Sequence, residues 1–252
     1  MNFRFLLSIG FLVFLFNCKQ DRLQLTKIEG KQIHITDSLP TNDSIENYIK
    51  PYRQHVEKDL EGVLSYAKNT YSKNDGRFNS ALGNLFADAV FAQTNPVFNK
   101  RTGKNIDMVL LNKGGIRAVL NKGNITTRTA YQLMPFENSI VVVSLKGTQV
   151  DSLITYLIKA KTAHPISKLK LKIDKDFQVV DVSINNNTID PNKNYYIATN
   201  DYLYNGGDGM FFFKQNDTVY KLDYKIRNAL IDYFKQTDTI NPIIDDRFIQ
   251  TK

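Results

Sequence analysis

The stretch from Ser139 to Ile158 joins two hydrophobic periods that belong to different kinds of secondary structure. Ser139–Leu145 is a mostly apolar, β-branched run that predicts a buried strand, and Gly147 ends it. The next apolar residues have the i, i+3, i+4, i+7, i+8 spacing of an amphipathic helix: Val150, Leu153, Ile154, Leu157 and Ile158. A strand that leads directly into a helix predicts a fold whose layers contain both.

Two later segments change the period to two. In residues 169–173 leucine and isoleucine alternate with lysine, and in residues 180–184 valine and isoleucine alternate with polar residues before an Asn-Asn-Asn turn. This alternation is typical of antiparallel strands with one buried face. Residues 195–199 are predicted as a further strand, and Asn205–Gly209 as a glycine-rich loop.

Three more helices are predicted, over residues 44–66, 84–92 and 222–234. The first contains Pro51, which must lie near its first turn or kink it. The inward positions of the other two are Leu85, Phe86 and Ala89, and Ile226, Leu230 and Phe234. Together with a short apolar strand over 106–111, these elements predict one mixed α/β (α+β) domain, a mixed sheet flanked by helices, over residues 43–252.

The first residues have the pattern of an export signal. Arg4 precedes an uncharged, mostly apolar run, Phe5–Phe16, and Cys18 follows almost at once. Twelve helical residues cover about 18 Å, less than the roughly 30 Å of a bilayer core. We therefore expect residues 1–17 to be a signal peptide, Cys18 to be lipidated, and residues 18–42 to be a tether. An ordinary signal peptide with an incidental cysteine is the alternative.

The chain carries a net charge of +8, which favours anionic ligands or surfaces. Nucleic-acid binding needs clustered basic residues with interleaved aromatics. The lysines here are scattered, and some alternate along strands, so we expect no nucleic-acid partner.

Two loops combine residues that packing alone does not select. Asn112–Arg117 follows the strand over 106–111, and its paired glycines let a backbone approach a ligand while Arg117 offers a rigid fork of donors. Thr199–Gly209 combines aromatics, a carboxylate and three glycines. Aromatic rings can stack on a base, and a carboxylate can accept both hydroxyls of a ribose. Ordinary turn chemistry would also produce such loops.

Several segments, in order, resemble the successive motifs of the 5′-nucleotidase C-terminal domain. They are Gly83–Ala89, Asn112–Ala118, Pro135–Asn138, Gly147 and Thr199–Gly209, and the similarity extends over about residues 43–250. The resemblance implies an α/β structure that clamps a base between two aromatic residues. It also implies that the phosphate end of the substrate reaches a separate phosphoesterase domain that holds two divalent metal ions.

The resemblance assigns roles to five residues. Phe136 and Tyr202 match the two stacking aromatics, although the second is commonly phenylalanine in the family. Asn112 and Arg117 match residues that contact base, ribose or phosphate, and Asp208 matches the ribose-binding aspartate. Each also has a structural alternative: a core residue, a turn former, a surface ion pair or an Asx turn.

The sequence departs from the family pattern at three places. Gly76 and Asn79 stand where the family usually has an arginine and a glutamate, and Glu137 replaces a usual glycine. Arg77 is one position away from the arginine site, and we expect it to reach the substrate by a different loop path.

The Asp, His and Asn motifs of a dimetal domain do not occur in the sequence. His34, His55 and His164 are isolated and are predicted to be surface residues. We therefore expect no catalytic residue, metal or cofactor in this chain.

The leading hypothesis is a nucleotide- or nucleoside-recognition domain that acts in nucleotide catabolism with a separate metallophosphatase. It would be lipid-anchored in the bacterial cell envelope, in the periplasm or on the outer membrane. The alternatives are a residual enzyme that acts alone and a structural or interaction lipoprotein whose pocket no longer binds nucleotides.

Overall fold

The computed structural model describes residues 24–251. The export signal and Cys18 lie outside the described residues. The chain divides into two units, Met1–Ile49 and Lys50–Lys252, with the boundary inside helix α2 (Asp43–Leu60). In the first unit, residues 24–42 form neither helix nor strand and are exposed throughout. Among residues 24–251, we find no helix that combines the length and apolar character needed to cross a membrane.

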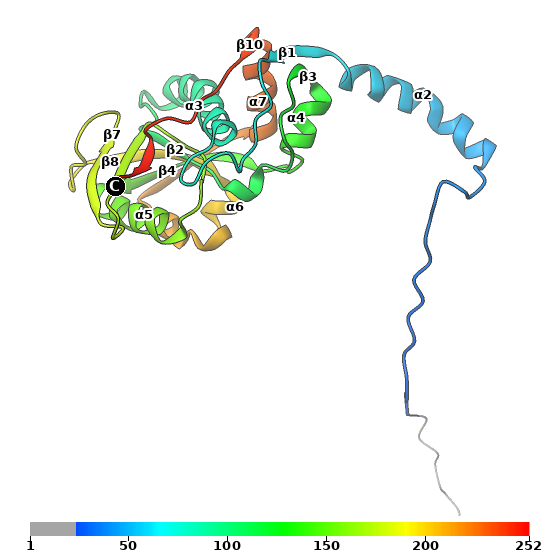
Figure 1. Cartoon of the computed structure of the whole chain (residues 1–252), viewed down its shortest axis with the longest axis horizontal. Helices are drawn as coiled ribbons and strands as arrows, with labels where there is room; N and C mark the ends of the chain where they lie inside the picture. The colour runs from blue at the N-terminus through cyan, green and yellow to red at the C-terminus, as the bar shows by residue number, and fades with distance from the viewer. Residues whose placement is uncertain (1–23, 252) are drawn as a thin grey trace, which may run out of the picture. The chain divides into compact units, whose positions relative to one another are not determined.

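The second unit is built around a five-stranded mixed sheet (Figure 1). Its strands, in spatial order, are β5 (Ile166–Ser167), β2 (Met108–Leu110), β8 (Asn194–Asn200), β4 (Ser139–Lys146) and β9 (Thr218–Lys225). β4 is antiparallel to both of its neighbours, whereas β2 and β8 are parallel. The sheet is therefore mixed, as the sequence predicts.

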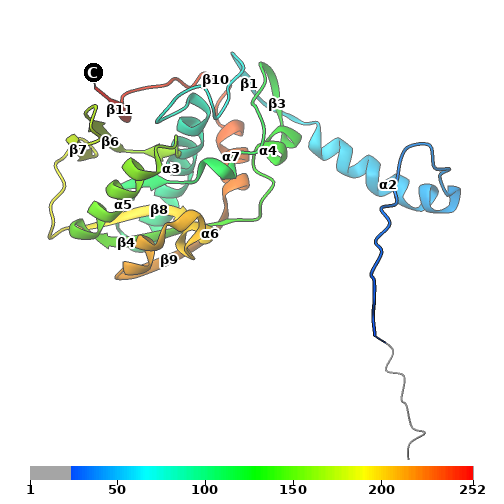
Figure 2. The same cartoon turned by 60° about the horizontal axis from the view of Figure 1, so that its bottom comes forward.

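Alternate residues of the central strands enter two separate cores. Val109, Val142 and Ala198 pack in the core that also contains residues of α3 (Ala81–Thr102), α4 (Thr127–Leu133) and α7 (Ile226–Lys235). Met108 and Val143 pack in the other core, with α5 (Gly147–Ala160). Because successive side chains of a strand point to opposite faces, helices cover both sides of the sheet (Figure 2).

Two small sheets complete the unit. One has the order β10 (Thr239–Ile240), β1 (Val63–Ala67), β3 (Gly123–Thr126). The other has the order β11 (Phe248–Gln250), β6 (Leu169–Ile173), β7 (Val179–Ile184). β6 and β7 are antiparallel, and the apolar residues of β6 are buried while its lysines are exposed, which confirms the period-two prediction for that strand. In β7 the predicted apolar face is not buried throughout, because Ile184 is buried but Val180 is exposed.

Three predicted helix boundaries are wrong. The helix predicted over 44–66 ends at Leu60, and Val63 and Leu64 belong to β1, where pairing with β3 overrides the helical spacing. Residues 222–225 belong to β9, so the last helix begins only at Ile226. The helix predicted over 84–92 runs from Ala81 to Thr102.

Pro51 and Pro96 both lie inside helices, α2 and α3. The sequence predicts Pro51 near the first turn of its helix or at a kink. Because α2 begins at Asp43, Pro51 lies beyond the first turn. The stripes that the sequence placed inward are buried in both predicted segments: Leu85, Phe86, Ala89, Ile226, Leu230 and Phe234.

Candidate functional site

A pocket of about 370 Å³ collects residues from three separate segments of the chain. It is lined by Asn112, Gly114, Gly115, Arg117, Phe136, Asn138, Tyr202 and Asp208. Five of the six residues that the sequence analysis selected therefore share one cavity. The rings of Phe136 and Tyr202 are both large apolar groups left partly open to solvent, with exposed fractions of 42% and 46%.

The first loop follows β2 and forms a short 3₁₀ turn, η1 (Lys113–Gly115). The side chain of Asn112 lies against its two glycines: a Cβ on Gly115 would come within 3.2 Å of the Asn112 Oδ1 atom. The Arg117 amide donates to the Leu133 carbonyl at 2.9 Å. The guanidinium carbon of Arg117 lies 5.7 Å from the centre of the Phe136 ring, so this loop and the Phe136 segment form one wall.

Two lysines add positive charge near Arg117. The Nζ atom of Lys73 donates to the Ile116 carbonyl at 2.6 Å. Partial burial lowers the pKa of Lys73, and the nearby charges of Arg117 and Lys113 lower it further. Three cations thus lie near one another at this loop, an arrangement that favours a bound anionic group.

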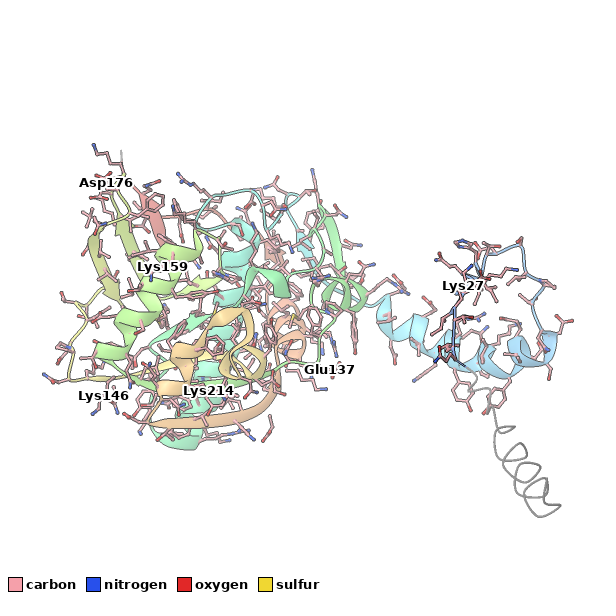
Figure 3. The ribbon with its side chains drawn as sticks, turned by 90° about the horizontal axis from the view of Figure 1, so that it is seen from below. Lys27, Glu137, Lys146, Lys159, Asp176 and Lys214 are labelled. Atoms are coloured by element: carbon pink, nitrogen blue, oxygen red, sulfur yellow. The ribbon has the colours of Figure 1, made fainter. Side chains whose placement is uncertain are left out.

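The segment that carries Phe136 is held by a buried guanidinium. Arg227, on α7, is 4% exposed, and its Nη1 atom lies 3.4, 3.2 and 3.3 Å from the carbonyl oxygens of Met134, Pro135 and Phe136. Its Nη2 atom donates to the carboxylate of Glu137, which is at the surface (Figure 3). The residue that replaces the usual glycine thus pairs with the cation that fixes the loop.

Arg227 is also held from its other side. Its guanidinium carbon lies 4.0 Å from the centre of the Tyr131 ring on α4, a cation–π contact. Its Nε atom makes no hydrogen bond to any described residue. One side chain thus connects α4, α7 and the Phe136 segment.

Asn138 joins the Phe136 segment to the second loop. Its Nδ2 atom donates to Asp201 Oδ1 at 3.0 Å. Asp201 is the first residue of the short helix α6 (Asp201–Tyr204), which carries Tyr202 and is capped by the side chain of Asn200. The two aromatic residues therefore project from segments that are connected by a hydrogen bond.

A hydrogen bond joins the side chains of Tyr202 and Asp208 within the second loop. The Tyr202 hydroxyl donates to Asp208 Oδ1 at 2.8 Å. This hydrogen bond and the negative charge of Asp208 raise the pKa of the Tyr202 hydroxyl. Its ring lies over Gly207, where a Cβ would come within 2.4 Å of ring carbon Cε1, so a side chain at that position would displace the ring.

Two further side chains, partly buried Tyr156 and buried His164, bond the backbones of the loops. The Tyr156 hydroxyl, on α5, donates to the Asp208 carbonyl at 2.8 Å. His164 is 6% exposed, and its Nδ1 atom accepts the amide proton of Lys113 at 3.4 Å. Burial, opposed by the charge of Asp208 and aided by that of Lys113, lowers the pKa of His164 to about 4. The ring is therefore neutral at pH 7 and can act as an acceptor.

The prediction that His164 is a surface residue is wrong, because α5 and the residues after it enclose its ring beside that of Tyr156, with the ring centres 5.7 Å apart. His34 and His55 are exposed, as expected. Within residues 24–251, no group of three or more His, Cys, Asp or Glu side chains is placed to hold a metal ion.

Arg77, the sixth candidate, does not line the pocket. Its Nη1 atom donates to Gln250 Oε1 at 2.8 Å, and its guanidinium carbon lies 4.8 Å from the centre of the Phe78 ring. These contacts place it beside β11, so the expected loop path to the substrate is not the observed one. Lys73 is the cation that this part of the chain brings to the Asn112–Arg117 loop.

A larger hollow of about 540 Å³ lies elsewhere on the unit, and all four of its carboxylates and guanidinium groups, with Lys170, are paired with one another. The Arg247 guanidinium bonds the carboxylates of both Asp88 and Asp245, and Lys170 pairs with Asp246. Although burial raises the pKa of Asp245, the bonds from Arg247 outweigh it and leave the pKa lowered. This network holds the C-terminal segment to α3.

Sequence reasoning missed four supporting residues, Lys73, Tyr156, His164 and Arg227. Lys73, Tyr156 and His164 each make one long-range hydrogen bond to a loop backbone, and Arg227 makes three. Such bonds leave no local pattern in the sequence. Asn138 had a signal, because it is part of the Pro-Phe segment that carries the family resemblance.

The model of the family described as "5′-nucleotidase, C-terminal domain" matches residues 59–215, which include every residue that lines the pocket. The chain belongs to this family. It is 25% identical over 242 residues to an apyrase of Tabanus yao, with 86% of this chain and 43% of the apyrase covered. It is also 25% identical over 239 residues to a cell wall protein of Listeria monocytogenes, with 86% and 30% covered.

A solved structure of a 5′-nucleotidase precursor from Thermus thermophilus has the same fold. It matches with a TM-score of 0.67 at 24% identity, and the match covers 84% of this chain and 44% of that one. This chain therefore spans less than half the length of these relatives.

Replacing Arg227 with methionine should lower the free energy of unfolding by about 1–3 kcal/mol, because buried carbonyl groups lose their donor. Lys225→Met is the matched control, since Lys225 also pairs with Glu137 but is much more exposed than Arg227 and should contribute less than about 1 kcal/mol. Urea unfolding of both variants measures the difference. Equal losses would contradict the role given to the buried guanidinium.

Proposed function

We propose that this chain is a nucleotide- or nucleoside-binding component of a 5′-nucleotidase system that acts in nucleotide catabolism. The observation that carries the proposal is the shared pocket: Asn112, Arg117, Phe136, Tyr202 and Asp208, selected from loops far apart in the sequence, line one open cavity. A pocket of about 370 Å³ lies within the range of small-molecule sites. An open cavity also favours binding over a purely structural lipoprotein.

The chemistry of the lining suits the parts of a nucleotide. The partly exposed rings of Phe136 and Tyr202 offer flat apolar surfaces to a base. The Asp208 carboxylate can accept ribose hydroxyls, and Arg117 offers a planar set of donors to phosphate. Lys73 and Lys113 add positive charge beside Arg117, which favours phosphorylated ligands over neutral nucleosides.

We propose that the hydrolytic step belongs to a separate metallophosphatase. The sequence contains none of the Asp, His and Asn motifs that the resemblance associates with a dimetal centre, and a two-metal mechanism needs such ligands to hold the ions about 3.5–4 Å apart. The two divalent metals would then be bound by that partner, and this chain would present the nucleotide to it.

We also propose that the protein is exported and anchored by a lipid on Cys18 in the cell envelope, in the periplasm or on the outer membrane. The apolar run before Cys18 supports the proposal, and so does the cell wall protein among the relatives. The exposed residues 24–42 would separate the lipid from the domain.

Phe136→Ala should weaken nucleotide binding about 5- to 150-fold, because base stacking contributes about 1–3 kcal/mol per base. Calorimetry with a panel of nucleosides and nucleoside monophosphates measures the change. Tyr66→Ala is the control, since Tyr66 is similarly exposed, at 41%, but lies in β1 and does not line the pocket. Absence of binding to any member of the panel by the unaltered chain would contradict the proposed function.

The isolated chain should release no phosphate from AMP in the presence of divalent metal ions. A candidate metallophosphatase mixed with it should hydrolyse nucleotides faster than alone, and Arg117→Ala or Asp208→Ala should abolish that gain. A colorimetric phosphate assay measures both. Steady phosphate release by this chain alone, removed by a chelator and absent in Asp208→Ala, would show that it is an enzyme by itself.

Cys18→Ala should move the protein from the detergent phase to the aqueous phase in a phase-partitioning assay, because the acyl chains are lost. Mass spectrometry of the N-terminal peptide should show acyl groups on Cys18 only in the unaltered protein. Unchanged partitioning and an unmodified Cys18 peptide would refute lipidation.

A further inference from the structure

The hydrogen bond between Tyr202 and Asp208 joins two functions that the pocket otherwise keeps separate. Tyr202 offers a ring to the base, and Asp208 offers a carboxylate to the sugar. The hydroxyl of the first donates to Oδ1 of the second at 2.8 Å, and both residues line the pocket. The ring and the carboxylate therefore do not adopt their positions independently.

Both partners are also fixed by the backbone between them. The Tyr202 ring packs on Gly207, so closely that a Cβ there would come within 2.4 Å of it. Asp208 has a φ of 52°, and its carbonyl accepts the Tyr156 hydroxyl at 2.8 Å. Because the main chain at Asp208 is held in this way, the position of its carboxylate depends only on the side-chain rotamer. The hydrogen bond from the Tyr202 hydroxyl favours one rotamer.

The hydroxyl leaves the carboxylate able to bind a sugar. A carboxylate has about four acceptor positions on its two oxygens, and Tyr202 occupies one of those on Oδ1. Two ribose hydroxyls can still donate to the remaining positions. A tyrosine hydroxyl is protonated at pH 7, and the Asp208 carboxylate raises the pKa of Tyr202 further, so the donor is present.

We propose that the Tyr202 hydroxyl is a positioning group that orients the Asp208 carboxylate toward the 2′ and 3′ hydroxyls of a bound ribose, and so sets the preference for ribose over sugars that lack them. This inference rests on the proposed nucleotide binding. Without the bond, an exposed Asp208 side chain would have to be ordered by the ligand itself. Ordering one side chain on binding weakens affinity by a factor of about 2 to 12.

The experiment compares Tyr202→Phe with the unaltered chain, because phenylalanine keeps the stacking ring and removes only the hydroxyl. Calorimetry is carried out with adenosine, guanosine, cytidine and uridine, with their 5′-monophosphates, and with the 2′,3′-dideoxy analogue of the ligand that binds best. Tyr202→Phe should weaken binding of the ribonucleoside about 3- to 10-fold and that of its dideoxy analogue less than about 2-fold. The ratio of the affinity for the ribonucleoside to that for the dideoxy analogue should therefore fall by nearly the same factor as the ribonucleoside affinity.

Two further variants separate positioning from a general structural effect. Tyr204→Phe removes a hydroxyl from the same short helix, but Tyr204 lies beside Lys214 and does not line the pocket, so both affinities should be unchanged. In an Asp208→Asn background, Tyr202→Phe should cause no additional loss of ribonucleoside affinity. Thermal unfolding of all variants checks that each is folded.

The outcomes are distinct. Equal weakening of ribonucleoside and dideoxynucleoside would mean that the hydroxyl places the ring rather than the carboxylate, and would overturn the inference. Unchanged or tighter ribonucleoside binding would overturn it as well, because the hydroxyl would then be inert or would compete with the sugar. If the unaltered chain binds none of the four nucleosides or their monophosphates, the proposed function fails first, before the variants are compared.

Discussion

Three consecutive carbonyl groups, those of Met134, Pro135 and Phe136, turn toward one buried guanidinium. Backbone carbonyls in an irregular segment have no neighbouring strand or helical turn to bond, and leaving them unpaired in a protein interior is costly. Arg227 satisfies them from α7, and Tyr131 covers its other face. The pocket wall that carries Phe136 is therefore positioned by a helix of the core rather than by the loop itself.

The same requirement recurs around the pocket. Lys73 satisfies the Ile116 carbonyl, His164 accepts the Lys113 amide, and Tyr156 donates to the Asp208 carbonyl. The loops that line the pocket are thus held in place by side chains outside the pocket. Arg117 and Lys113 lie on the first loop, with Lys73 beside them, and the carboxylate of Asp208 lies on the second loop. The cavity therefore has a positive side and a negative side, and this asymmetry would favour one orientation of a bound molecule.

Local patterns in the sequence predict the mixed α/β class and the buried stripes, and they point to two candidate ligand loops. The resemblance to the family was needed to select all five residues that share the pocket, because Phe136 lies in neither loop. Asn112, Arg117 and Asp208 stood out because strand ends and paired glycines are local signals. Arg227 could not be found in this way, since it lies next to Ile226 in a helical pattern where a charged residue normally faces water. The first helix was extended too far because Val63 and Leu64 fit its spacing, whereas pairing with β3 decides their conformation.

The segment over residues 239–250 joins both small sheets: β10 pairs with β1, and β11 pairs with β6. Asn79 and Asn84 bond its carbonyl groups at Asp245, Phe248 and Ile243. The edges of both sheets thus depend on contacts between residues far apart in the sequence, and such contacts form late because long loops must close first. During synthesis, β1 emerges early, but it can pair with β10 only after almost the whole unit has left the ribosome.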